Sequence, residues 1–412
     1  MKFKRATKAF LALFLTCAVA LSARSIFAAQ AKVMVNGTLV ELQTENDQGR
    51  ILVPYDTLTK ALSAKVDYDP SNGTIWIYRG PRYAGMQTGH KSMTAGRFGE
   101  DETSVTLETA PRLIGGVPYV PLRAVAETLG LTVGWDGNAG MASIDGETSI
   151  AVTSMDELLT EVGIKATNLS REFDIELVGM AGDEAGTNIC DYYPAVAKSE
   201  AKWWVYEADG VKNCFVKYKL DYFMYANIGK AMKTGDFSGL SQEEQAVYKE
   251  AQRVISSVTT PEMTYYEKEK AAHDYLVANT KYDMSAEVPE ISHTPYGALI
   301  NHVAVCNGYS DAFKVLMDII GVPCDVVYGM ARLPGAAAVA HSWNRVMLDG
   351  EYYLVDVTWD DPTPDRAGQV AYEYLNVTDE KMSKDRKPSV VNTRKKSVST
   401  KYNYFVYEGI TS

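Results

Sequence analysis

Two stretches near the start of the chain repeat one pattern of apolar and polar positions. Residues 53–58 align without a gap onto residues 120–125, at an offset of 67, and apolar positions further along, such as Val66 and Val133, coincide as well. In each stretch the pattern predicts a strand, a short helix and then a hairpin. Two small units that each expose an apolar face bury it against one another, so residues 33–148 are predicted to form one duplicated α+β domain.

The following segment, residues 150–260, alternates between strand-like and helix-like patterns. Apolar and polar positions alternate over residues 173–178 and 214–218, which predicts strands. Capping residues followed by helical spacing predict helices over residues 154–162 and 241–258. We therefore expect a mixed α/β region that leads into the next domain.

A further domain, residues 261–412, is predicted to begin with a helix over residues 261–279. The apolar stripe of this helix includes Tyr275 and Leu276. His273 falls outside the stripe, so its side chain is expected to face solvent.

A cysteine stands at the start of the next predicted helix. Residues 310–320 carry apolar side chains at helical spacing, and Gly321 ends the pattern. Cys306 lies directly ahead of this apolar stripe, whereas a structural cysteine would more naturally lie within it. The unpaired amides and the dipole at a helix N-terminus favour an anion, so this position stabilises a thiolate and lowers its pKa.

The hairpin that follows places a histidine and an aspartate. Residues 341–348 and 351–359 have strand-like patterns, and the Asp-Gly pair between them is a strong signal for a two-residue turn. With that turn, the two residue numbers of each facing pair on the strands add to 699. His341 and Asp356 then share one face as diagonal neighbours, about 7 to 8 Å apart at the backbone. A slip of one residue would separate them.

Cysteine, histidine and aspartate in this chain order can act as nucleophile, base and orienting group. The alternative is that the three residues coincide by chance in a mixed α/β core. The helix start at Cys306 and the shared face of His341 and Asp356 favour the catalytic interpretation.

The segments around these residues resemble the bacterial transglutaminase-like family, over roughly residues 260–390. The motifs that carry the resemblance are residues 272–276 (AHDYL), 280–283 (TKYD), 296–299 (YGAL), 304–309 (AVCNGY), 341–344 (HSWN), 356–362 (DVTWDDP), 374–380 (YLNVTDE) and 383–385 (SKD). Two positions depart from the family pattern, which usually has a histidine where Arg386 stands and often a glutamate where Asn307 stands. Neither departure is expected to affect the triad.

The resemblance implies a papain-like α+β core, in which a helix bearing the cysteine packs on an antiparallel sheet bearing the histidine and the aspartate. Cys306 would be the nucleophile, His341 the general base and acid, and Asp356 the group that orients His341. The thiolate would attack a carboxamide or peptide carbonyl, and the acyl group would pass to an amine or to water. The Cys306 backbone N–H would hold part of the oxyanion.

Trp343, Tyr309 and Asn344 are the candidate substrate-binding residues, and for Trp343 a place in the cleft beside His341 and a place in the core both stay open. No cofactor and no metal are expected, because the chain has no histidine pair four apart and no Cys-x-x-Cys pair.

The duplicated domain resembles the copper amine oxidase N-terminal-like, or stalk, domain of exported bacterial proteins. The second repeat carries this pattern in residues 120–123 (VPLR), 126–127 (AE), 129–130 (LG) and 135–136 (WD). His90 is the only histidine in the region, and a lone histidine is a poor basis for a copper site. The resemblance leaves open whether this domain binds wall polymer, binds partner proteins or acts as a spacer.

The first 29 residues have the features of a secretory signal peptide. Basic residues precede an apolar stretch from Ala9 to Leu21, which is too short to span a bilayer permanently. Removal of the five basic residues before position 30 changes the net charge from −11 to −16. This charge argues against nucleic acid as a partner and against purely electrostatic binding to anionic wall polymers. Export also permits a disulfide, and whether Cys190 pairs with Cys214 stays open.

The sequence therefore predicts a secreted or envelope-associated cysteine enzyme that acts on a protein or peptide substrate. Transfer to an amine and hydrolysis, as in a cysteine protease or amidase, are both consistent with the triad. An alternative of another class is a non-catalytic envelope scaffold in which the triad is vestigial.

Overall fold

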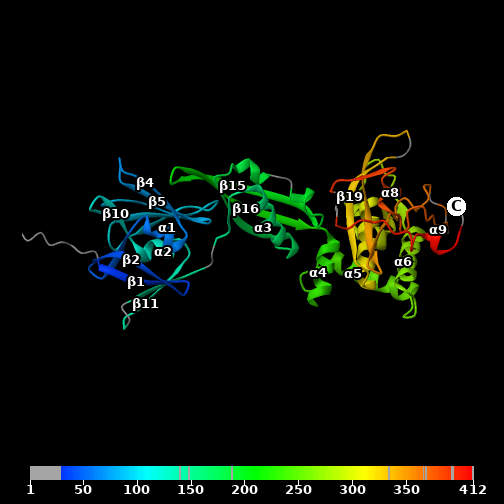
Figure 1. The fold of residues 1–412 in the computed structure, drawn as a ribbon, viewed down its shortest axis with the longest axis horizontal. Coiled ribbons are helices and arrows are strands. Elements are labelled where there is room, and N and C mark those ends of the chain that lie inside the picture. Colours follow the sequence, from blue (N-terminus) through cyan, green and yellow to red (C-terminus); the bar gives the residue numbers. More distant parts are fainter. Residues whose placement is uncertain are drawn as a thin grey trace, which may run out of the picture. The chain divides into compact units, whose positions relative to one another are not determined.

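The computed structural model describes residues 29–410, apart from 139–140, 147–148, 187–188, 333–334, 365, 367–368 and 391–393. The predicted signal peptide lies outside the described residues, save its last position. The chain divides into two compact units (Figure 1). One comprises Met1–Tyr78, Arg82–Gly96 and Glu102–Glu147, and the other comprises Arg79–Pro81, Arg97–Asp101 and Thr148–Ser412.

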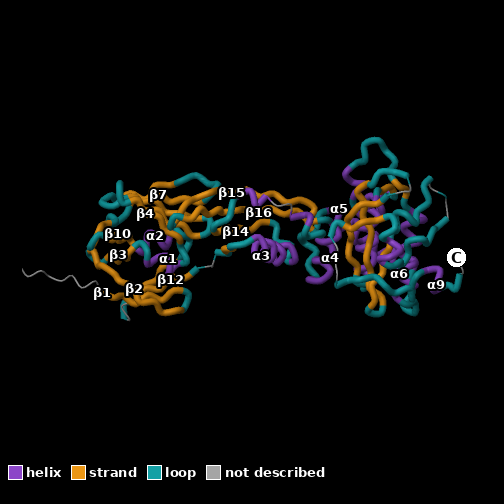
Figure 2. The backbone as a smooth tube through the Cα atoms, turned by 45° about the horizontal axis from the view of Figure 1, so that its top comes forward, coloured by secondary structure: helices purple, strands orange, loops and turns teal. Residues whose placement is uncertain are grey.

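The first unit is built mainly of strands (Figure 2). Its elements are β1 (Ala29–Val35), β2 (Thr38–Asp47), β3 (Arg50–Pro54), α1 (Thr57–Leu62), β4 (Lys65–Asp69), β5 (Thr74–Arg79), β6 (Arg82–Gln87), β7 (Ser92–Arg97), β8 (Thr103–Thr106), β9 (Arg112–Ile114), β10 (Val117–Pro121), α2 (Leu122–Thr128), β11 (Thr132–Asp136) and β12 (Met141–Asp145).

Both repeats of this unit have the predicted order of strand, short helix and hairpin. The equivalent strands β3 and β10 pair with each other in antiparallel fashion, with Val53 opposite Val120. Apolar side chains from both repeats meet in one buried cluster, which includes Leu62 of α1 and Val125 of α2. The repeats thus bury their apolar faces against one another.

The hairpins of the two repeats belong to different sheets. In the described part of the chain, β11 and β12 extend a seven-stranded sheet of order β11-β12-β1-β2-β3-β10-β9, in which β1 runs parallel to β12. The hairpin of the first repeat instead begins a five-stranded sheet of order β4-β5-β6-β7-β8. The chain between the repeats supplies β6, β7 and β8, and these strands continue the sheet from β5.

The second unit begins with a four-stranded sheet of order β13-β14-β16-β15 against which α3 packs. Ser154 caps α3 by accepting a hydrogen bond from the Glu157 backbone N–H. Cys190 and Cys214 are free thiols in this structure. The elements are β13 (Ala151–Val152), α3 (Met155–Thr167), β14 (Glu172–Val178), β15 (Val196–Ala208) and β16 (Val211–Tyr222), with 3-10 turns η1 (Gly182–Gly186) and η2 (Ile189–Asp191).

The rest of the unit places its longer helices on one face of a second antiparallel sheet, of order β21-β20-β19-β22. The helices are α4 (Met224–Thr234), α5 (Gln242–Val258), α6 (Tyr265–Asn279), α7 (Cys306–Ile320), α8 (Asp379–Met382) and α9 (Tyr404–Tyr407). The strands are β17 (Lys281–Tyr282), β18 (Val303–Ala304), β19 (Cys324–Ala331), β20 (Val339–Leu348), β21 (Glu351–Val355) and β22 (Arg386–Pro388), and η3 (Glu290–His293) and η4 (Gly297–Asn301) are short helical turns.

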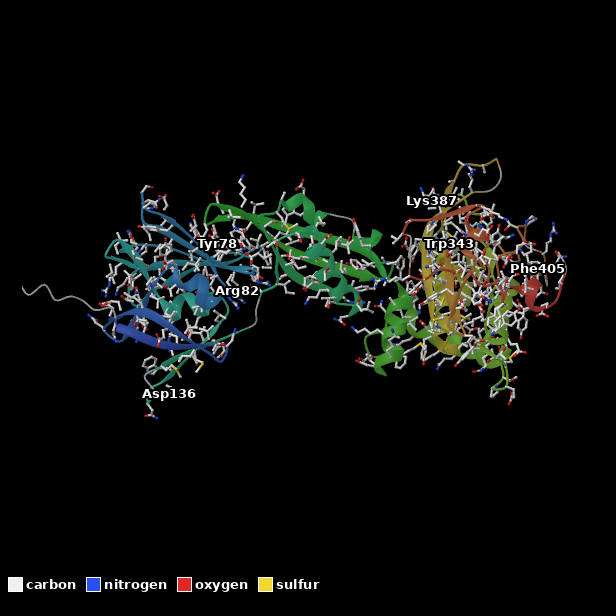
Figure 3. All side chains as sticks on the ribbon, in the orientation of Figure 1. Tyr78, Arg82, Asp136, Trp343, Lys387 and Phe405 are labelled. Carbon is white, nitrogen blue, oxygen red and sulfur yellow. The ribbon has the colours of Figure 1, made fainter. Side chains whose placement is uncertain are left out.

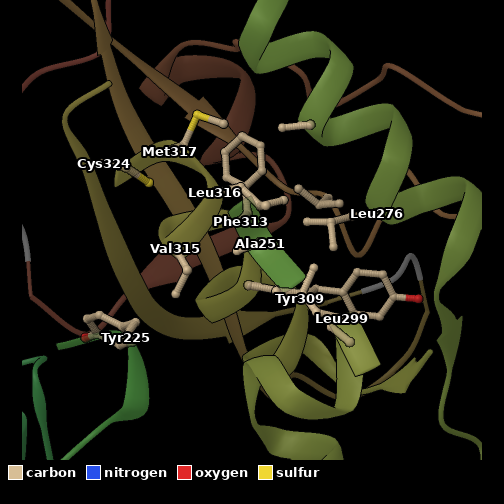
Figure 4. Close-up of a cluster of buried hydrophobic side chains, with 14 of the residues drawn as sticks. Tyr225, Ala251, Leu276, Leu299, Tyr309, Phe313, Val315, Leu316, Met317 and Cys324 are labelled. Atoms are coloured by element: carbon tan, nitrogen blue, oxygen red, sulfur yellow. The ribbon is translucent and has the colours of Figure 1, made fainter. Parts of the chain in front are cut away.

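One buried cluster holds the helices and this sheet together (Figure 4). Phe313 of α7 and Leu276 of α6 belong to it, and it reaches back to Tyr225 of α4. The helices α4 and α5 therefore pack with the core, although the predicted boundary at residue 261 assigned them to the preceding region. The helix α6 begins at Tyr265, because Thr264 and Glu267 form a capping box there.

The hairpin of β20 and β21 has the predicted register. Leu348 pairs with Glu351 and Asn344 with Val355 around a two-residue turn. Asp349 and Gly350 both have positive φ, 50° and 81°, as a turn of type I′ requires. The expected strand to residue 359 was too long, since β21 ends at Val355.

Among the described residues, no helix is both long enough and apolar enough to cross a membrane.

A glycine allows three parts of this sheet to approach closely. Gly329 of β19 lies between β22 and the Trp343 ring (Figure 3 labels Trp343 and Lys387), and a Cβ there would lie 2.7 Å from Trp343 Cη2 and 2.8 Å from Pro388 Cα. We expect Gly329→Ala to lower the free energy of unfolding by about 1–3 kcal/mol, because the backbone of β22 cannot move away freely. Denaturant unfolding measures this change.

The matched control is Gly239→Ala, where an added Cβ would meet nothing within 4 Å. Equal stability of the two variants would contradict the packing argument.

Candidate active site

The helix α7 positions Cys306 at its first residue. Val305 precedes it in an extended conformation. An apolar side chain cannot cap the helix, so Val305 provides no acceptor for the backbone N–H groups of the first turn. The apolar face of the helix anchors it in the core. Cys306 is only 8% exposed, and its Sγ lies 3.4 Å from Asn307 Oδ1.

The sheet brings His341 and Asp356 together. His341 lies near the start of β20, and Asp356 directly follows β21. His341 Nε2 lies 2.7 Å from Asp356 Oδ2. The predicted proximity is therefore present, although Asp356 no longer belongs to the ladder. The chain turns there because Asp356 Oδ1 accepts the Trp359 backbone N–H at 3.1 Å.

The electrostatics of the three residues favour a charged cysteine–histidine pair. Burial alone raises the pKa of Cys306, but hydrogen bonds and charge from His341, together with hydrogen bonds from Ser342, outweigh it and lower the pKa. For His341, burial alone would lower the pKa, but Asp356 and Cys306 outweigh it and raise the pKa to about 9. Because Nε2 faces Asp356, Nδ1 is the ring nitrogen left for Cys306. An imidazolium is thus the favoured form of His341 near neutral pH, and its charge stabilises the Cys306 thiolate.

A fourth residue, Arg386, contacts the aspartate of this group. Arg386 Nε donates to Asp356 Oδ2 at 2.7 Å, and Nη2 lies 2.6 Å from the same oxygen without hydrogen-bond alignment. Burial would raise the pKa of Asp356, but His341 and Arg386 keep it below its usual range. The expectation that the change at position 386 leaves the triad untouched was wrong.

Aromatic rings fix these charged groups in place. The Arg386 guanidinium lies 3.9 Å from the Trp359 ring centroid and 4.0 Å from that of Tyr374. The Trp359 ring also packs against His341, at 5.7 Å between centroids. Cation–π contacts of this kind are strongest in desolvated surroundings, and both Arg386 and His341 are buried.

The comparisons with known families agree with this geometry. Residues 251–357 match the Transglutaminase-like superfamily, and residues 34–144 match the Copper amine oxidase N-terminal domain. The chain combines a copper amine oxidase N-terminal domain with a transglutaminase-like core. That core has the α+β fold that the resemblance implied, with the cysteine helix packed on the antiparallel sheet.

Individual relatives match over limited parts of their length. Kyphoscoliosis peptidase of Homo sapiens is 27% identical over 115 residues, which are 26% of this chain and 17% of that protein. The Mus musculus protein of the same name is 28% identical over 102 residues, 23% of this chain and 15% of its own. The match thus spans less than a fifth of each relative. A TGase crystal structure aligns with 81% of this chain and 75% of its own, at 14% identity and a TM-score of 0.25.

The three residues expected to bind substrate lie inside the transglutaminase-like core. Tyr309 is fully buried, and its hydroxyl donates to Asp361 Oδ2 at 2.5 Å. Asn344 is fully buried, and its Nδ2 donates to the Ser310 carbonyl at 2.9 Å. Trp343 is 2% exposed and stacks on His341. All three pack within the core around Cys306 and His341, and their contact with substrate stays a prediction.

A second buried histidine lies in the same core. His273 of α6 is fully buried, whereas its position on the helix predicted exposure. Its Nε2 lies 3.2 Å from Asp360 Oδ2 and its Nδ1 lies 3.1 Å from Asp274 Oδ1. Burial lowers the pKa of His273, but these two carboxylates raise it to about 9. The contact between His273 and Asp360 links α6 to the segment that follows Asp356.

We expect iodoacetamide to alkylate Cys306 with a half-maximal rate below about pH 8.5, the ordinary thiol value, because His341 stabilises the thiolate. In His341→Ala the effect of burial remains and only the Ser342 hydrogen bonds oppose it, so the midpoint should move to higher pH. Mass spectrometry of the modified peptide across pH measures both profiles.

Cys324 is the internal control, since burial raises its pKa and it should stay unmodified. Identical profiles for the wild type and His341→Ala would contradict a coupled pair.

Proposed function

We propose that the protein is an exported cysteine enzyme that transfers acyl groups from glutamine carboxamides or peptide bonds through a Cys306 thioester. The observation that carries the proposal is the group of Cys306, His341 and Asp356 at the junction of α7 and the sheet. The match to the Transglutaminase-like superfamily supports the same chemistry. Proteins or cell-wall peptides would be the substrates.

In the first half of the reaction the Cys306 thiolate attacks the carbonyl carbon. A C–S bond forms, and the carbonyl electron pair moves to oxygen, where the amides at the start of α7 stabilise the charge. The pair then returns and the C–N bond breaks. The His341 imidazolium gives its proton to the leaving nitrogen, so ammonia or an amine departs and a thioester remains.

In the second half the neutral His341 takes a proton from the acceptor that attacks the thioester. An amine acceptor gives a new amide, and water gives a carboxylic acid. In both cases the C–S bond breaks and the thiolate is restored. Asp356 keeps Nε2 of His341 engaged throughout, which leaves Nδ1 to exchange the proton.

Hydrolysis is the second candidate reaction. The curated relatives of the core are named peptidases, although the match covers less than a fifth of each. The same triad would then act as a cysteine protease or amidase. A non-catalytic envelope scaffold is the remaining alternative, and the paired charges of Cys306 and His341 weigh against it.

The setting of the enzyme is proposed from the sequence. The signal-like N-terminus supports secretion or association with the cell envelope. The copper amine oxidase N-terminal domain would bind wall polymer or surface proteins, or hold the core away from the surface.

Incubation with a glutamine-containing peptide and a primary amine tests the proposed reaction. We expect mass spectrometry to find either the amine-substituted peptide, the deamidated peptide or the cleaved peptide, since each route has its own mass change. Cys306→Ala should abolish every product, because no thioester can form. Products that persist in Cys306→Ala, or their absence with wild-type protein across varied peptides, would sink the proposal.

Arg386→Gln should lower kcat on the order of 100-fold, because His341 loses its fixed orientation when Asp356 loses its second partner. The acid limb of the pH profile should also move upward, since Arg386 helps to lower the pKa of Asp356. Arg386→Lys keeps the charge without the fork and should lose less.

Thermal unfolding of both variants checks that the core is intact. A loss of kcat in Arg386→Gln without any change in the acid limb would assign Arg386 a purely structural role.

A further inference from the structure

A cavity of about 380 Å³ lies on the sheet face that points away from α7. Trp343 and Arg345 of β20 line it, and residues two apart on a strand share a face. Their neighbour Asn344 points the other way and bonds to α7 at Ser310. Val327, Leu354 and Met382 give the cavity an apolar floor. The cavity therefore lies on the face of β20 that also carries His341, and Arg386 of its lining contacts Asp356.

Two buried donors at this cavity have no partner within the part of the chain that the structure describes. They are the indole N–H of Trp343, a residue 2% exposed, and Nε of Arg345, a residue 9% exposed. Asp379 pairs with Arg345 only at longer range, since its Oδ1 lies 3.7 Å from Nη2, beyond hydrogen-bond length. Buried N–H groups are rarely left without an acceptor, so two in one cavity indicate a missing acceptor.

The charge of the lining favours an anion. Arg345, Arg386 and Lys396 face a single acidic residue, Asp379. Arg386 is matched by Asp356 and Asp385, which leaves two cations against one carboxylate. A carboxylate has two oxygens that accept hydrogen bonds, and it fits a pair of N–H donors over an apolar floor.

We propose that this cavity binds a carboxylate carried on an apolar group, as in the C-terminal residue of a peptide or a small free acid. Its volume lies at the small end of ligand sites, which suits one or two amino-acid residues. Trp343 and Arg345 donate to the carboxylate, while the floor receives the apolar group. The site does not depend on the reaction at Cys306.

Titration of the full-length Cys306→Ala protein tests this site, because that variant cannot consume a peptide. The probes are N-acetyl-leucine, the peptide Gly-Gly-Gly-Leu and the C-terminal amide of each. The protein has six tryptophans, and Trp343→Phe identifies which indole N–H resonance belongs to Trp343. We expect the acids to shift that resonance. The same shift should need at least a tenfold higher concentration of the corresponding amide. The tighter of the two acids identifies the source of the carboxylate.

Variants of the lining extend the test. Arg345→Met should weaken binding about tenfold through loss of charge and donor. Lys396 is exposed, so Lys396→Met should weaken binding only about twofold. This second variant still tests the site if Arg345→Met does not fold. The control Arg253→Met, on the exposed side of α5, should change nothing. A Trp343 resonance that no acid moves, equal shifts by acid and amide, or affinities unchanged in both lining variants would overturn the proposal and leave water as the occupant.

Discussion

The carboxylate of Asp356 has no contact with solvent, and much of the core is arranged around that fact. An isolated carboxylate in such surroundings is strongly destabilising, so it must be paired and hydrogen-bonded. His341 and Arg386 both approach Oδ2, and the Trp359 backbone donates to Oδ1. Because one partner comes from β20 and the other from β22, the charge joins two strands that are not neighbours in the sheet.

This arrangement also sets the reactivity of Cys306. Arg386 helps to keep Asp356 ionised, and the ionised Asp356 raises the pKa of His341. The resulting imidazolium lowers the pKa of a thiol that burial alone would raise. The effects thus run from Arg386 through Asp356 and His341 to Cys306. Arg386, which lies against the rings of Trp359 and Tyr374, therefore helps to stabilise the thiolate form of Cys306.

The sequence predicted the parts of this site that short-range rules determine. An Asp-Gly pair fixes a two-residue turn, so the register of β20 on β21 followed from it. The start of α7 followed from the edge of its apolar stripe. Arg386 could not be placed in this way, since β22 has only three residues and pairs with β19 across more than fifty positions of the chain. The one available signal was its departure from the family pattern.

His273 and the two repeats show why a local pattern predicts an element but not its partner. His273 lies on the buried face of α6 beside Leu276 and Val277, and its charge is accommodated there because Asp360 pairs with it. Similarly, both repeats of the first domain form the same strand, helix and hairpin, but β6 extends one hairpin and β1 pairs with the other. In each case a distant segment decides the outcome. Sequence reasoning is thus most secure for the cysteine helix and its hairpin, and weakest for whatever completes their surroundings.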